Sequence, residues 1–210
     1  FPNVAVQNLY GQTENTPAAT SLLDDAALTK IGSVGKPLAR TEVKLLNADG
    51  KEVALGEVGE ICVRGPQVMK GYLRNLEETS NTIRNGWLHS GDLGRFDDEG
   101  YLYIVDRKKD MIIRGGENIY PIEIEEVLYQ IPEILEAAVV GVPHEVYGEV
   151  PKAFIVLKED QTLTEEAITN YMKTQLAKYK VPAEVEFIDS LPRNASGKVL
   201  KHTLRPTQNV

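Results

Sequence analysis

The sequence is poor in the residues that build disulfide frameworks and zinc sites. Cys62 is the only cysteine among 210 residues, and the histidines number three. A single cysteine cannot pair within the chain, and so few thiol and imidazole groups do not supply a Cys/His zinc site. The composition therefore indicates a reducing, cytoplasmic setting.

Long apolar runs and an excess of positive charge are also lacking. Uninterrupted apolar stretches such as Ala137 to Val140 fall far short of the roughly 20 residues that a membrane-spanning helix needs, so no membrane span is expected. The formal net charge of −8 argues against a nucleic-acid partner, because binding to phosphates requires a basic surface. Small-molecule partners are favoured, and formation of a homo-oligomer is left open.

The first half of the chain has the pattern of short strands joined by tight turns. Glu42 to Leu46 precedes the dipeptide Asp49-Gly50, and Gly94 to Phe96 is followed by an acidic, glycine-containing turn and the run Tyr101 to Val105. Such turns between alternating apolar residues are typical of β-hairpins. Residues 1–105 are therefore expected to form a β-rich domain.

The second half alternates helical and strand patterns. Apolar residues recur at helical spacing behind Pro121, a residue suited to the first turn of a helix. Strand patterns follow at Ala137 to Val142 and Ala153 to Leu157, then a helix capped by Thr164 and a last strand. Residues 106–210 are therefore expected to form a small α+β domain, and the fold class of the chain is α+β.

The segment Asp106 to Asn118 combines alternating charge, a short apolar patch and the pair Gly115-Gly116 near mid-chain. We interpret it as a hinge leading into a glycine-backed binding loop, since paired glycines let a thin ligand pass close to the backbone. A solvated charged turn is the alternative.

Tyr10-Gly11-Gln12-Thr13-Glu14 places an aromatic ring, a glycine, a hydroxyl and a carboxylate within five residues. Such a set could stack on a base, let phosphate approach the backbone and hold Mg²⁺ through oxygen. A strand end followed by a capped loop also explains these residues, and from them alone we favour that structural interpretation.

Three further polar residues have two interpretations each. Asp92 follows a flexible glycine and could accept two hydrogen bonds from a vicinal diol such as ribose, although a turn aspartate is commoner. Arg107 could bind phosphate or form a surface ion pair. Lys198, after Gly197 on a polar loop, could bring a point charge to an anion or be an ordinary tail lysine.

Two catalytic patterns are excluded. No glycine lies five residues before Gly197, and Val199 stands where a phosphate-binding loop requires Ser or Thr, so the chain is not a P-loop NTPase. No Gly-x-Ser-x-Gly pattern surrounds Ser90, which argues against nucleophilic catalysis of the hydrolase type.

Taken in order, five segments resemble the adenylate-forming superfamily of acyl-CoA synthetases, luciferases and peptide-synthetase adenylation domains, most closely the medium- and long-chain fatty acyl-CoA ligases. The resemblance covers essentially the whole chain and rests on Tyr10 to Glu14, Gly65 to Tyr72, Gly86 to Asp92, Asp106 to Pro121 and Pro192 to Lys198. It implies a ligase that joins a carboxylic acid, here a fatty acid, to AMP with MgATP and then transfers the acyl group to CoA.

The resemblance also implies residue roles in the adenylation step. Thr13 and Glu14 would contact phosphate and Mg²⁺, Tyr10 with Gly11 would lie by the adenine, and Asp92 would bind the ribose hydroxyls of ATP or AMP. Arg107 would support the nucleotide. Lys198 would be the adenylation lysine.

For the second step, the resemblance implies rotation of the small domain about a hinge at Lys109. Gly115 and Gly116 would then line the tunnel for the pantetheine arm of CoA. Tyr147 and Lys180 could touch CoA.

The Ser/Thr- and Gly-rich phosphate loop of the family has no counterpart in the sequence. We therefore expect the C-terminal portion of a longer protein, inactive by itself. Alternatives are an adenylation domain that loads a carrier protein and a catalytically silent interaction module. Retention of Asp92, Arg107 and Lys198 together counts against the silent module.

Overall fold

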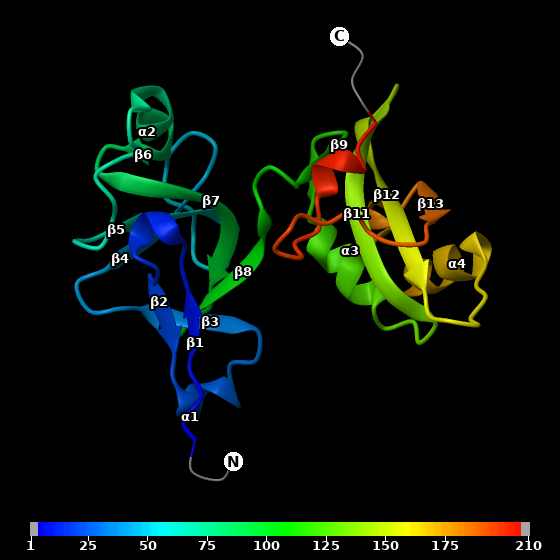
Figure 1. The fold of residues 1–210 in the computed structure, drawn as a ribbon, viewed down its shortest axis with the longest axis horizontal. Coiled ribbons are helices and arrows are strands. Elements are labelled where there is room, and N and C mark those ends of the chain that lie inside the picture. The colour runs from blue at the N-terminus through cyan, green and yellow to red at the C-terminus, as the bar shows by residue number, and fades with distance from the viewer. Residues whose placement is uncertain (1–3, 207–210) are drawn as a thin grey trace. The chain divides into compact units, whose positions relative to one another are not determined.

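The computed structural model describes residues 4–206, and the chain divides into two compact units, Phe1–Lys108 and Lys109–Val210. Figure 1 shows strands dominating both units. Within the described residues, no helix has the length and apolar character needed to cross a membrane. The α+β fold class expected from the sequence is confirmed.

The first unit is built on one twisted antiparallel sheet. In spatial order the strands are β1 (Asn8–Tyr10), β2 (Thr20–Leu22), β3 (Ser33–Pro37), β8 (Leu102–Arg107), β7 (Trp87–Phe96), β5 (Gly59–Arg64) and β4 (Glu42–Leu46), with β6 (Ile83–Arg84) paired to β7. Three short helices, η1 (Thr13–Asn15), α1 (Asp24–Ala27) and α2 (Leu76–Thr82), lie between strands.

The β7–β8 hairpin confirms the turn expected after Phe96. The Asp97 carboxylate accepts hydrogen bonds from the backbone N–H groups of Glu99 and Tyr101, at 3.0 and 2.8 Å, and Gly100 takes a positive φ of 79°. Apolar side chains of the sheet then fill the core of this unit, with Ile61, Val63 and Leu88 fully buried. The hairpin is thereby fixed to the middle of the sheet.

The second unit combines a sheet with helices. Strands β10 (Glu117–Ile119), β9 (Ile112–Arg114), β12 (Gly148–Leu157) and β11 (Ile134–His144) follow in that spatial order, and β13 (Glu184–Phe187) pairs in parallel with β12. The helices are α3 (Pro121–Leu128), α4 (Glu165–Gln175), η2 (Lys178–Lys180) and η3 (Lys201–Thr203). The hydroxyl of Thr164 accepts from the Ala167 N–H at 3.2 Å, which confirms the predicted N-cap.

The sheet of the second unit is buried on both faces, because alternate residues of a strand point to opposite sides. Val139 and Ile155 pack in one apolar cluster with residues of α3 and α4. Val140 and Phe154 pack in a second cluster with Leu191 from the segment after β13. This explains why β11 and β12 are almost continuously apolar in sequence.

The segment around Gly115-Gly116 differs from the loop that the sequence suggested. These glycines form the two-residue turn of the β9–β10 hairpin, with Arg114 opposite Glu117 and φ values of 58° and 93°. A tight hairpin turn of this kind needs positive φ at both central positions, which glycine adopts at little cost. The paired glycines are therefore required by the backbone of this turn.

Candidate functional site

Tyr10, Asp92 and Arg107 are brought together in the first unit by the sheet. Asp92 on β7 lies directly opposite Arg107 on β8, and Arg107 Nε is 3.8 Å from Asp92 Oδ1. The Tyr10 hydroxyl, from the end of β1, donates to Asp92 Oδ2 at 2.8 Å. A carboxylate has about four acceptor positions, so Asp92 can still accept hydrogen bonds from a diol.

Burial and the neighbouring Asp92 carboxylate hold the pKa of Tyr10 well above its ordinary value. The phenol therefore stays protonated at neutral pH and acts as a donor to Asp92. This interaction fixes the Asp92 carboxylate from one side.

Thr13 and Glu14 lie in the turn η1, where the segment after β5 holds Glu14 at two points. The Tyr72 hydroxyl donates to Glu14 Oε1 at 2.8 Å, and the Met69 N–H donates to the Glu14 carbonyl oxygen at 2.8 Å. Thr13 is exposed at the start of the turn. The two chemical groups that a phosphate and cation site needs, a hydroxyl and a carboxylate oxygen, are thus adjacent in this turn.

The oxygen groups of this turn fit a Mg²⁺ ion that is shared with phosphates better than a closed protein cage. Glu14 is outside both groups of three metal-capable side chains found among residues 4–206. Mg²⁺ commonly binds through one or two carboxylates while phosphates and water complete its shell. Glu14, with Thr13 beside it, supplies a donor set of that size.

Gly11 is required by a close approach of two backbone segments. A Cβ atom at this position would lie 1.9 Å from the Pro17 carbonyl oxygen and 2.7 Å from the Ala18 Cα. We expect Gly11→Ala to destabilise the first unit by about 2 kcal/mol or more, since overpacking against backbone forces the chain to shift. Thermal unfolding should show its midpoint lowered by roughly 10 °C.

Gly50→Ala is the matched control for that substitution. Gly50 has a φ of +75°, and a Cβ atom at this position would have no other atom within 4 Å, so alanine there meets backbone strain without a clash. The expected loss is about 1 kcal/mol. Equal losses in the two variants would contradict the importance of the close approach at Gly11.

The second unit brings Gly115 and Tyr147 together. The Gly115 N–H donates to the Tyr147 carbonyl oxygen at 2.8 Å, and the Arg114 guanidinium stacks 4.7 Å from the centre of the Tyr147 ring. Tyr147 remains half exposed, and Gly116 has open space around its Cα. A narrow ligand can therefore lie along this turn against an aromatic ring.

Lys180 joins the same region through Arg114. Arg114 Nη1 donates to the carbonyl oxygen of Tyr179, the residue before Lys180, at 2.6 Å. Burial disfavours the charged form of Lys180, but the Glu123 carboxylate at 2.7 Å outweighs it and holds the pKa of Lys180 above its ordinary value. The ammonium is therefore charged at neutral pH.

Lys198 is exposed on a loop that Asn194 organises. Asn194 Oδ1 accepts from the N–H groups of Ser196 and Lys198, at 3.0 and 2.9 Å, and Gly197 takes a φ of 83°. The side-chain amide of Asn194 thus shapes the backbone that presents Lys198. Lys109, the expected hinge, is exposed and is the first residue of the second unit.

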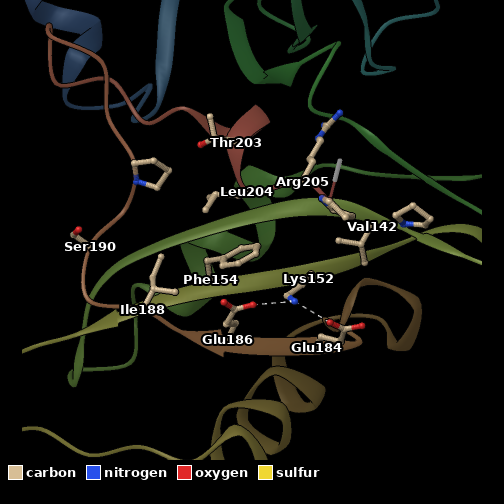
Figure 2. Close-up of a pocket in the computed structure, with 13 residues that line it drawn as sticks. Val142, Lys152, Phe154, Glu184, Glu186, Ile188, Ser190, Thr203, Leu204 and Arg205 are labelled. Carbon is tan, nitrogen blue, oxygen red and sulfur yellow. Dashed lines mark ion pairs between the residues drawn. The ribbon is translucent and has the colours of Figure 1, made fainter. Parts of the chain in front are cut away.

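A cavity of about 670 Å³ lies in the second unit between the sheet and the segment after β13. Figure 2 shows Lys152 between Glu184 and Glu186, with the ammonium 3.0 Å from each carboxylate. Phe154 and Leu204 provide apolar lining. None of the residues predicted from the sequence as site residues lines this cavity.

Sequence reasoning missed two residues that orient the candidate site. Tyr72 fixes Glu14, and Arg114 connects Tyr147 to Tyr179. Gly71-Tyr72 was part of the resemblance but carried no role, because its contact with Glu14 spans 58 residues and is set by the fold. The position of Arg114, directly before the paired glycines, is a signal that could have identified it.

Cys62 is a buried thiol whose reactivity can be predicted. Burial, helped by the Glu60 carboxylate, raises the pKa of Cys62 to about 12. Only about one thiol in ten thousand is then ionised at pH 8. We expect iodoacetamide to leave the folded chain unlabelled and to add one label in denaturant, as read by mass spectrometry; rapid labelling of the folded chain would contradict this environment.

The comparisons with known proteins cover both units. The AMP-binding enzyme family matches residues 1–73, and the AMP-binding enzyme C-terminal domain family matches residues 123–198. The 2-succinylbenzoate–CoA ligase of Geobacillus kaustophilus is 46% identical over 202 residues, which are 96% of this chain and 41% of that protein. The chain therefore spans about two fifths of the length of the curated relatives that it matches.

Two solved structures extend the likeness to three dimensions. The o-succinylbenzoate CoA synthetase (MenE) of Bacillus subtilis, in complex with the acyl-adenylate intermediate OSB-AMP, has a TM-score of 0.89 and 43% identity, over 97% of this chain and 41% of that chain. ATP-bound MatB from Rhodopseudomonas palustris has a TM-score of 0.88 and 41% identity, over 95% of this chain and 40% of that chain. On both family matches and these likenesses, the chain belongs to the superfamily of AMP-binding enzymes.

Proposed function

We propose that the chain is the C-terminal portion of an AMP-forming acid–thiol ligase whose carboxylic acid is 2-succinylbenzoate. The observation that carries the proposal is the likeness to the Bacillus subtilis enzyme with its acyl-adenylate, which extends over 97% of this chain. The 46% identity to a 2-succinylbenzoate–CoA ligase supports the same substrate. ATP, Mg²⁺ and CoA are then the expected co-substrates and cofactor.

The fatty acid substrate expected from the sequence is not supported by these relatives, which point to 2-succinylbenzoate. A physical reason lies in what the five segments contain. Their side chains are suited to a nucleotide, a cation or a thiol carrier, and none forms a pocket for an acyl chain. MatB, a protein with a different name, is still 41% identical to this chain. The likeness of this region is therefore shared by relatives with different names.

In the proposed adenylation step, residues of the first unit hold the nucleotide. Asp92, fixed by Tyr10, accepts hydrogen bonds from the ribose hydroxyls, and Arg107 adds positive charge beside them. Glu14, oriented by Tyr72, would hold Mg²⁺, with the Thr13 hydroxyl beside it. Mg²⁺ would supply charge neutralisation of the phosphates.

Lys198 supplies a further positive charge in this step. Attack of the acid on the α-phosphorus forms an oxygen–phosphorus bond and expels pyrophosphate, and negative charge builds on the phosphoryl oxygens in the transition state. A fixed cation is most effective where that charge develops. The Asn194-organised loop presents Lys198 for this role.

In the proposed thioester step, the second unit receives CoA. The Gly115-Gly116 turn gives the narrow pantetheine arm a path without side chains, and the Tyr147 ring lies beside that turn. Lys180, kept charged by Glu123, suits the phosphates of CoA. Attack of the CoA thiol on the acyl-adenylate forms the carbon–sulfur bond and releases AMP.

An acid panel tests the proposed function in the parent enzyme. AMP release is measured with ATP and Mg²⁺, with and without CoA, for 2-succinylbenzoate and for saturated fatty acids. We expect AMP release that requires both CoA and 2-succinylbenzoate. A preference for another acid would overturn the substrate, and pyrophosphate exchange indifferent to CoA would favour loading of a carrier protein.

The chain by itself is expected to form no thioester, because it corresponds to only 41% of the length of its relatives. Thioester formation by these 210 residues with ATP, acid and CoA would contradict the proposal that it is one portion of the ligase. If the parent enzyme releases no AMP with any acid, the result would favour the alternative of a catalytically silent interaction module.

A further inference from the structure

Glu60 on β5 is a buried carboxylate, and one of its partners, Lys108, is the last residue of the first unit. The residue is 6% exposed, and its Oε2 atom is 3.0 Å from His89 Nδ1 and 2.9 Å from Lys108 Nζ. Arg84 adds a more distant cation at 4.0 Å. Although burial favours protonation of Glu60, hydrogen bonds from His89 and Lys108 hold its pKa below the ordinary value.

Glu60, Cys62 and His89 lie close enough together to be considered as a metal site, but their surroundings argue against one. The Lys108 ammonium already occupies the carboxylate oxygen that faces His89. The Cys62 thiol is kept protonated by burial, whereas a metal requires the thiolate. The cluster is better suited to receive the positive charge of Lys108.

Lys108 is held by its backbone as well as its side chain. Its N–H donates to the Gly91 carbonyl oxygen at 2.9 Å, directly beyond the Asp92–Arg107 pair of the β7–β8 ladder. It is also the last residue of the first unit. The ion pair with Glu60 therefore holds Lys108, the last residue of the first unit, against the sheet.

A second anchor holds the other side of the boundary. Arg205 Nη2 donates to the Lys109 carbonyl oxygen at 3.0 Å and lies 3.8 Å from the Asp110 carboxylate, all within the second unit. The contacts on the first side thus end at Lys108, and those on the second side begin at the carbonyl group of Lys109. The ψ rotation of Lys108 and the φ and ψ rotations of Lys109 lie between the two anchors.

We propose that Glu60 and Arg205 are positioning residues that confine rotation between the units to the backbone from the Cα of Lys108 to the carbonyl group of Lys109. The inference rests on the proposed function and on the rotation about Lys109 that the resemblance implies between its two half-reactions. Hinges are a few residues that absorb a large change in φ and ψ while their flanks stay rigid. Here two side chains, distant in sequence, make the flanks rigid.

Hydrogen exchange of the intact chain tests each anchor separately. Glu60→Gln should raise exchange of residues 106–108 by about fivefold or more and leave residues 110–112 unchanged, because a lost anchor lowers local protection. Arg205→Met should show the reverse pattern. Lys108→Arg, which retains a cation for Glu60, should keep the protection of residues 106–108.

Glu42→Gln is the control for loss of an ion pair elsewhere in the same sheet, since Glu42 on β4 pairs with Arg64 on β5. It should leave both boundary segments unchanged. Unchanged exchange in Glu60→Gln and Arg205→Met, or a rise spread evenly through the affected unit, would overturn the inference. Neither result depends on catalysis, so it is separable from failure of the proposed function.

Kinetics of the parent enzyme distinguish positioning from general stabilisation. In Glu60→Gln, each half-reaction measured in a single turnover should stay within about twofold, whereas steady-state turnover, which requires repeated rotation, should change by about threefold or more. Equal loss in both half-reactions and in turnover would indicate a structural role and contradict the assignment.

Discussion

Replacing Lys198 with alanine in the parent enzyme is expected to slow acyl-adenylate formation by about 100- to 1,000-fold, the usual cost of removing one group that stabilises charge in a transition state. Conversion of supplied acyl-adenylate and CoA into thioester should be nearly unaffected, because the thiol attacks the acyl carbon in that step and no bond to phosphorus is made or broken. Pyrophosphate exchange measures the first step, and thioester formation from synthetic acyl-adenylate measures the second.

Lys173→Ala is the matched control for Lys198→Ala. Lys173 is an exposed lysine in the last turn of α4 and lies outside the candidate site, so both half-reactions should proceed at the normal rate. Equal loss of both half-reactions in Lys198→Ala would count against the assigned role. A normal rate of pyrophosphate exchange in that variant would remove the role altogether.

Replacing Gly116 with leucine is expected to do the opposite. The side chain would stand in the open space at the β9–β10 turn and obstruct the pantetheine arm, so thioester formation should fall by about 100-fold, as for a small misplacement of a reacting group. Adenylation should change only a few fold, since the first step does not use CoA. The two half-reaction assays again provide the measurement.

Leucine at Gly116 also strains the backbone, because φ is 93° there. Gly100→Leu is the control, since Gly100 has a φ of 79°, equally open space and a place in the β7–β8 turn of the first unit. Similar kinetic losses in both variants would show that strain alone explains the effect. Loss of adenylation alone in Gly116→Leu would make the tunnel assignment wrong.

Much of the fold followed from local patterns in the sequence. The acidic, glycine-containing turn after Phe96, the Thr164 cap and the apolar runs of β11 and β12 each specify a local structure through few neighbours. The β9–β10 hairpin was missed because its strands are only three residues long and mostly charged or exposed. Paired glycines indicate a turn, but they do not reveal which strands it joins.

The pairing of Asp92 with Arg107 could not be predicted by counting residues back along the two strands from the hairpin turn. Extending the pairing of Gly94 with Ile104 by regular alternation would place Asp106 opposite Asp92, and two carboxylates in that arrangement repel. An irregularity between Leu93 and Gly94 shifts the register by one residue and brings Arg107 there instead. The ion pair of the candidate site thus depends on a β-bulge that the sequence does not announce.

The fatty acid substrate predicted from the sequence is not supported by the relatives, and the reason is again physical. Roles could be assigned only to groups that suit a nucleotide, a cation or CoA, because none of the five segments builds an acyl pocket. An acid's identity is set by the pocket that encloses it. The substrate therefore had to come from relatives rather than from the residues of this chain.

The most direct measurement is a single turnover of the parent enzyme with 2-succinylbenzoate, ATP and Mg²⁺, followed by addition of CoA. Mass spectrometry should detect enzyme-bound 2-succinylbenzoyl-adenylate and one equivalent of pyrophosphate before CoA is added, then the CoA thioester and AMP afterwards. Release of ADP and phosphate, or an adenylate that persists in the presence of CoA, would contradict the account.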